Sequence, residues 1–118
     1  MLIAISVRGN DLDAPLDPRL GRAERFLLVD SDTDAVKVLE TGAAQTTHGA
    51  GIQTAQLLIK AGVKAVISGD CGPKAFAVFQ TAGVPVHGAD GGTAREVLAA
   101  WRAGQLPVIG QPGGAHRR

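Results

Sequence analysis

The fold of this chain is decided by residues 52–73, which read IQTAQLLIKAGVKAVISGDCGP. Four apolar residues of this stretch recur at the spacing of one helical face: Ile52, Ala55, Leu58 and Ile59. Gly62 stands where a left-handed residue ends a helix, and residues 63–68 form an apolar run of strand length. Because proline suits the first turn of a helix, Pro73 predicts that a second helix follows.

Upstream of this stretch the sequence predicts three strands. Residues 2–7 are apolar, and residues 25–30 are apolar on both faces, which favours a central position in a sheet. Residues 31–34 have the composition of a turn and lead directly into a third strand over residues 35–40. So short a connection predicts an antiparallel hairpin. Residues 11–21 combine prolines, a glycine and charges, which is typical of a loop.

Downstream, the sequence predicts a short strand and a third helix. The second helix is expected to end before Gly83, and a strand follows over residues 84–87, where Pro85 favours an edge position. Residues 93–96 match a capping box, which marks the start of a helix. Gly104 is placed to stop it.

The predicted order, β-β-β-α-β-α-β-α, defines a single α/β domain. Since helical crossovers join parallel strands, the first, fourth and fifth strands should be parallel and the second antiparallel to them. The result is a mixed five-stranded sheet with helices on both faces, which we interpret as ribonuclease-H-like. We assign residues 1–104 to this domain and residues 105–118 to a C-terminal segment that is largely flexible from residue 111.

The composition excludes several classes of protein. With 12 Lys+Arg against 11 Asp+Glu in 118 residues, the chain lacks the basic excess of a general nucleic-acid binder. No apolar run approaches the ~20 residues that span a bilayer, and the N-terminus does not resemble a signal peptide. One cysteine permits no internal disulfide and no four-cysteine metal site. We therefore expect a cytoplasmic protein that binds neither nucleic acid nor a membrane. Residues 2–7 hold no carboxylate, which argues against metal-dependent nuclease chemistry.

The predicted strand directions gather the loops 8–24, 41–51, 69–73 and 87–92 at one end of the sheet, together with the N-termini of all three helices. Helix N-termini offer free N–H groups and a partial positive charge, so this end suits an anion. The alternative is that its glycines only form tight turns. Ten of the 16 glycines lie here: Gly9, Gly21, Gly42, Gly49, Gly51, Gly69, Gly72, Gly88, Gly91 and Gly92. We expect basic side chains on the same side to add charge-assisted contacts, namely Arg8, Arg19, Arg22 and Lys74.

Cys71 lies just before a predicted helix N-terminus, where a thiolate is stabilised. It is a candidate nucleophile or soft-metal ligand, and the alternative is a small packing residue. His48 and His87 are predicted at the same edge, so the three residues form a weak candidate metal site of mixed nitrogen and sulfur ligands. The alternative is that both histidines are surface residues. Asp70 beside Cys71 allows a small-molecule enzyme as a further interpretation, but no acid–base set is visible, so we predict no catalytic residues.

Three segments of the chain resemble a known family. They are DPRLGRA at residues 17–23, HGAGIQTA at residues 48–55 and GDCGPKA at residues 69–75. In this order they resemble the dinitrogenase iron–molybdenum cofactor biosynthesis family, and most closely its orange protein branch. The resemblance spans about residues 2–104, and Leu20 departs from the phenylalanine common before that glycine.

The resemblance implies a non-enzymatic protein that binds or carries an anionic metal–sulfur cluster without covalent attachment. The implied cluster is a molybdenum–copper sulfide, with an iron–molybdenum–sulfur cluster or none as alternatives. Such a cluster brings its own sulfides, so a chain with one cysteine can hold it through N–H donors and cations. The cofactor-binding residues carried over from the family are Arg19, Gly21, Arg22, His48, Gly49, Gly51, Gly69, Cys71, Gly72 and Lys74.

The alternative function comes from a different class. Family operons also encode ATPases of the chromosome- or septum-positioning type, which implies a multiprotein complex. The chain is then a cofactor-free interaction or regulatory module that docks on such an ATPase. A monomer is the expected state outside that complex.

Overall fold

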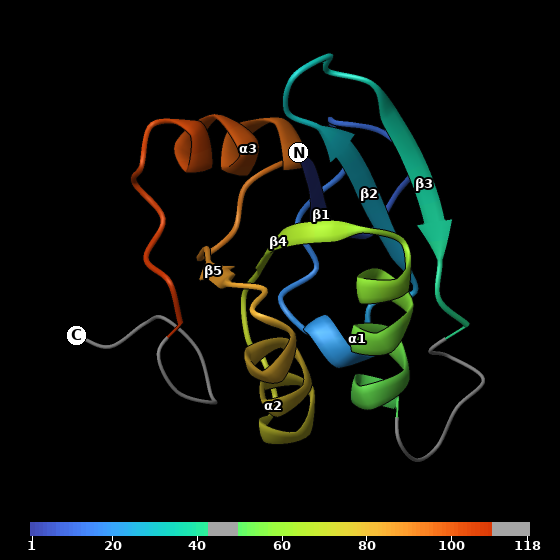
Figure 1. Ribbon diagram of the computed structural model, residues 1–118. Coiled ribbons are helices and arrows are strands. Elements are labelled where there is room, and N and C mark those ends of the chain that lie inside the picture. The colour runs from blue at the N-terminus through green and yellow to red at the C-terminus, as the bar shows by residue number, and fades with distance from the viewer. Residues whose placement is uncertain (43–49, 110–118) are drawn as a thin grey trace.

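The computed structural model describes residues 1–42 and 50–109, in which five strands form one sheet in the order β3-β2-β1-β4-β5 (Figure 1). The strands are β1 (Leu2–Val7), β2 (Arg25–Asp30), β3 (Val36–Glu40), β4 (Val63–Ser68) and β5 (Val86–Gly88). The helices are a short 3-10 helix, η1 (Leu20–Arg22), and the α-helices α1 (Ala50–Lys60), α2 (Pro73–Ala82) and α3 (Ala94–Arg102).

The strand directions confirm the predicted mixed sheet. β1 pairs antiparallel with β2 and parallel with β4, and β4 pairs parallel with β5. β2 and β3 form the predicted antiparallel hairpin. The fifth strand begins at Val86, two residues later than predicted, because the N–H of Val84 still donates to the carbonyl of Phe79 and closes the end of α2.

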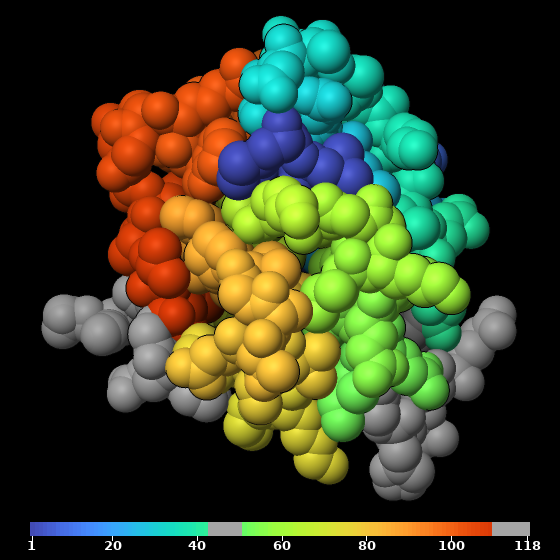
Figure 2. Space-filling view, in the orientation of Figure 1, coloured from blue at the N-terminus to red at the C-terminus, as the bar shows by residue number. Residues whose placement is uncertain are grey.

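The helices cover both faces of the sheet, as predicted. α1 and α2 lie side by side over one face, where Leu58 and Phe79 pack with Phe26 in a buried cluster (Figures 1 and 2). α3 lies over the other face, where Val97 packs with Leu27. The two clusters have the sheet between them, so the ends of the sheet are the places where loops from both faces meet.

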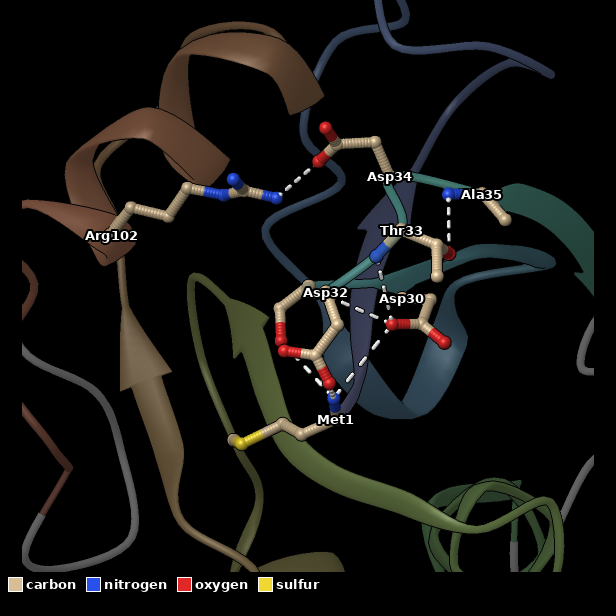
Figure 3. Close-up of polar contacts among 8 residues, drawn as sticks. Met1, Asp30, Asp32, Thr33, Asp34, Ala35 and Arg102 are labelled. Atoms are coloured by element: carbon tan, nitrogen blue, oxygen red, sulfur yellow. Dashed lines mark hydrogen bonds and ion pairs between the residues drawn. The ribbon is translucent and has the colours of Figure 1, made fainter.

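One end of the sheet is closed by the β2–β3 turn (Figure 3). The N–H of Asp32 donates to Asp30 at 2.9 Å, and such backbone hydrogen bonds hold the pKa of the Asp30 carboxyl below its ordinary value. The amino group of Met1 donates to Asp32 at 3.0 Å, and Arg102 of α3 pairs with Asp34 at 2.6 Å. These contacts fix the turn against β1 and α3, and the helix N-termini lie at the opposite end.

Residues 105–109 follow α3 and run along the outer edge of β5. The N–H of Ile109 donates to the carbonyl of Val86 at 2.7 Å, and Ile109 is buried. The domain limits at residue 104 and the flexibility from residue 111 stay predictions, since residues 110–118 lie outside the described part. Across residues 1–42 and 50–109, every helix is too short or too polar to cross a membrane.

Candidate functional site

Three loops meet at the carboxyl ends of the parallel strands, as the strand directions predict. The N–H of Asp70, after β4, donates to the carbonyl of Pro18 at 2.6 Å. The N–H of Leu16 donates to the carbonyl of Gly92, after β5, at 2.9 Å. A Cβ on Gly69 would lie 2.8 Å from the Cα of Pro18, so the two backbones approach as closely as glycine allows. The first and third family-like segments are therefore in direct contact.

Glycines also bring η1 against the first turn of α1. A Cβ on Gly21 would lie 3.1 Å from the Cα of Gly51. A Cβ on Gly51 would lie 3.4 Å from the Cβ of Ala75 in α2. The N-terminal turns of α1 and α2 and the η1 turn thus form one surface. His48 and Gly49 of the second segment lie outside the described residues.

Basic side chains stand on this surface. Arg19 is the N-cap of η1, Arg22 is its last residue, and Lys74 is in the first turn of α2; all three are exposed. Gly72 is the N-cap of α2 and has no side chain, so the N-cap residue does not cap the first-turn N–H groups of α2. Asp70, which precedes α2 in the chain, is exposed and carries an opposing charge. This surface combines cations with a helix N-terminus, which suits an anion.

A pocket of about 280 Å³ opens beside η1, where β1 ends and β2 begins. We call it the arginine pocket. Its lining residues are Val7, Arg8, Asp17, Arg19, Arg22, Glu24 and Arg25. A second pocket, of about 310 Å³, lies between α2, β5 and residues 108–109 and has no charged lining residue. Of these two pockets, the arginine pocket has the chemistry for an anion.

Asp17 is the buried charge of the arginine pocket. Its side chain is only 5% exposed, and it pairs with Arg8 at 3.8 Å and with Arg19 at 3.5 Å. The N–H of Arg19 also donates to Asp17 Oδ1 at 3.0 Å. The sequence places Asp17 only within a predicted loop, and this last hydrogen bond, to the N–H two residues on, is typical of a turn in such a loop. The burial and the two ion pairs were missed.

Two buried serines anchor the same segment. Ser6 Oγ donates to the carbonyl of Asp17 at 2.6 Å and lies 2.8 Å from Ser68 Oγ. Neither serine was singled out from the sequence. The available signal is that each interrupts an apolar strand near its carboxyl end, in β1 and in β4. A buried hydroxyl needs a partner, and here the partner is the loop that carries Asp17 and Arg19.

The expectation of a stabilised thiolate at Cys71 is wrong. Cys71 is fully buried with Phe79 and Ala75 in the cluster beneath α1 and α2. Burial raises the pKa of the Cys71 thiol from 9.0 to about 11, because the charged form loses its solvation. The residue precedes a helix N-terminus as predicted, but its side chain packs inward.

We therefore expect Cys71 to react with a disulfide reagent such as Ellman's reagent at pH 8 at least about a hundredfold more slowly in the folded protein than in denaturant. The same chain in denaturant is the control. Burial makes the pKa of the Cys71 thiol higher in the folded protein than in the unfolded chain. The thiol therefore favours folding below pH 9, and this contribution to stability is lost as the pH rises toward 11. Rapid reaction of the folded protein would contradict this burial.

The structure does not bring His87 and Cys71 together. His87 is paired in the sheet with Ile67, whose side chain packs on the α3 face. The His87 ring stands edge-on to the Trp101 ring, with 6.3 Å between the ring centroids. Its Nδ1 lies 3.2 Å from the carbonyl oxygen of Leu106. Cys71 lies in the cluster on the other face. The described residues contain no group of three His, Cys, Asp or Glu side chains able to hold a metal ion.

Known proteins resemble this chain in sequence and in fold. A family model described as dinitrogenase iron–molybdenum cofactor matches residues 1–104. A protein of Methanocaldococcus jannaschii is 32% identical over 109 residues, which is 90% of this chain and 89% of that protein. The apo form of the orange protein from Desulfovibrio gigas superposes with a TM-score of 0.88 at 39% identity, covering 94% of each chain. A NifB-like protein from Thermotoga gives a TM-score of 0.81 at 34% identity, covering 91% of each.

These matches define a class of small α/β proteins with a mixed sheet. The chain belongs to the dinitrogenase iron–molybdenum cofactor family. The resemblance stated from three short segments is thereby confirmed over most of the chain.

Proposed function

We propose that this protein binds and carries an anionic metal–sulfur cluster, of the molybdenum–copper sulfide or the iron–molybdenum type. The cluster would sit without covalent attachment on the surface formed by η1 and the N-terminal turns of α1 and α2. The same proposal makes the protein a carrier rather than an enzyme. We further propose that its sheet is of the ribonuclease-H-like type and that it works in the cytoplasm.

The observation that carries this proposal is the meeting of η1, α1 and α2 through Gly21 and Gly51. Their close approach sets Arg19 and Arg22 beside two helix N-terminal turns. Uncapped N–H groups and guanidinium groups are donors to anions, and a cluster with its own sulfide ligands presents a negatively charged surface. The family name and the orange protein neighbour are consistent with a cofactor of this kind.

The burial of Cys71 refines how the cluster would be held. A thiol with a pKa of about 11 in a packed core is a poor metal ligand, because the thiolate is the ligating form. We therefore assign the holding of the cluster to cations and backbone N–H groups, and Cys71 to the packing beneath them. The side chains that would hold the cluster are the exposed cations of the predicted cofactor-binding set, Arg19, Arg22 and Lys74.

Reconstitution tests the proposal. Purified protein is mixed with tetrathiomolybdate and copper(II) and then desalted, and the visible spectrum and the metal content are measured. We expect charge-transfer bands and retained metal. A colourless, metal-free protein after desalting would contradict the proposal and favour the alternative, a cofactor-free module that docks on a partner ATPase.

A further inference from the structure

The cluster-carrier proposal assigns no role to the arrangement of charged side chains in the arginine pocket. Four arginines converge on it: Arg8 follows β1, Arg19 is the N-cap of η1, Arg22 is the last residue of η1, and Arg25 begins β2. Asp17 and Glu24 also line it, and Arg25 pairs with Glu40 at 3.5 Å. The charged groups thus leave an excess of positive charge, and a pocket of about 280 Å³ admits a compact ligand.

Asp17 attracts two of these arginines without using up their hydrogen-bond donors. Its ion pairs with Arg8 and Arg19 measure 3.8 and 3.5 Å between Nε and the carboxylate oxygens. Charge-assisted hydrogen bonds are shorter, at about 2.7–2.9 Å. The side chains of Arg8 and Arg19 stay 53% and 59% exposed, so both guanidinium groups are accessible from the pocket.

The backbone that carries this carboxylate is fixed by hydrogen bonds from two sides. Ser6 donates to the carbonyl of Asp17, and the N–H of Asp17 donates to the carbonyl of Ser6 at 2.8 Å. The next residue, Pro18, accepts from the N–H of Asp70. Since β1 and the loop after β4 both fix this segment, Asp17 is a fixed point between two long and flexible side chains.

We propose that the arginine pocket binds a compact anion with several acceptor atoms, and that Asp17 positions Arg8 and Arg19 to contact it. The inference rests on the proposed function: the anion is a mononuclear thiometallate or one end of the cluster. Asp17 acts through the two arginines, as an outer partner orients a ligand-binding group.

Replacing the charge of Asp17 separates positioning from simple electrostatics. Electrostatics alone predicts that Asp17→Asn tightens anion binding, because a negative charge leaves the pocket. Positioning predicts weaker binding, by about tenfold. Glu24→Gln is the matched control, since it removes an exposed carboxylate from the same lining and is expected to tighten binding. Affinity for tetrathiomolybdate, with and without copper(II), is measured by titration calorimetry.

A double-mutant cycle adds a readout that a purely structural role would not change. If Asp17 positions Arg8, then Arg8→Gln should cause a smaller loss of affinity for tetrathiomolybdate in the Asp17→Asn protein than in the unsubstituted protein. In the unsubstituted protein, the Nε–H resonances of Arg8 and Arg19 should shift together on addition of tetrathiomolybdate. That measurement does not depend on the folding of any variant.

The outcomes distinguish the two proposals. If the unsubstituted protein binds but Asp17→Asn binds as tightly as Glu24→Gln, the positioning role is overturned and the carrier proposal stands. The positioning role is also overturned if the losses of affinity caused by Arg8→Gln and Asp17→Asn are additive. It is overturned as well if only the Nε–H resonances of Arg22 and Arg25 shift when the anion is added. If the unsubstituted protein binds the anion neither with nor without copper(II), the carrier proposal falls and this inference falls with it.

Discussion

Replacing Gly69 with alanine is expected to lower the free energy of unfolding by about 3 kcal/mol. The added Cβ would lie 2.8 Å from the Cα, Cβ and carbonyl oxygen of Pro18, and a backbone cannot yield as the end of a flexible side chain can. The contact joins the loop after β4 to the loop that carries Asp17, so the strain falls on the candidate site itself. Urea unfolding followed by circular dichroism measures the change.

Gly72→Ala is the matched control for Gly69→Ala. It adds the same methyl group three residues later, where nothing lies within 4 Å and the φ of −64° suits any residue. Because alanine is a poorer N-cap than glycine, we expect a loss below about 1 kcal/mol. Equal losses for the two variants would contradict the close approach of Gly69 and Pro18.

The second large effect concerns cluster retention. Arg19→Gln and Arg22→Gln are each expected to weaken retention of a reconstituted cluster by about tenfold, since a hydrogen bond to a charged group contributes about 1.5 kcal/mol or more. Cys71→Ala should weaken retention less, because the thiol is buried. Metal content after desalting, followed over successive dilutions, gives the apparent affinity.

Lys64→Gln is the control for the arginine variants. Lys64 is exposed and lies at the start of β4, at the far end of the sheet from η1, so the same change in charge is made away from the site. The Lys64→Gln protein should retain the reconstituted cluster as well as the unsubstituted protein does. If Cys71→Ala weakens retention more than either arginine variant, direct ligation by the thiolate is favoured and the electrostatic account is wrong.

The elements of the fold were predictable because local signals fixed their ends. Gly62 and Gly83 adopt positive φ values of 91° and 73°, as the predicted helix ends require. Thr93 and Glu96 form both hydrogen bonds of the predicted capping box. Strand directions then followed from the lengths of the connections, and they placed the loops that form the site.

The roles of single side chains at the site were less predictable. The position of Cys71 before a helix was visible, but whether its side chain faces solvent or the core depends on how α1 and α2 pack. His87 alternates with Val86, which packs on the Cys71 face, and strict alternation in the strand therefore separates the two candidate ligands. Asp17 is buried by the path of a loop, which local sequence does not determine.

The most direct test of the carrier proposal is the composition of the protein purified from its native source. Metal analysis and an assay for acid-labile sulfide are made on the same sample, together with the visible spectrum. We expect a coloured protein that contains molybdenum with copper or iron, and acid-labile sulfide in molar excess over the single cysteine of the chain. A colourless protein free of metal and sulfide, purified in complex with an ATPase, would contradict it.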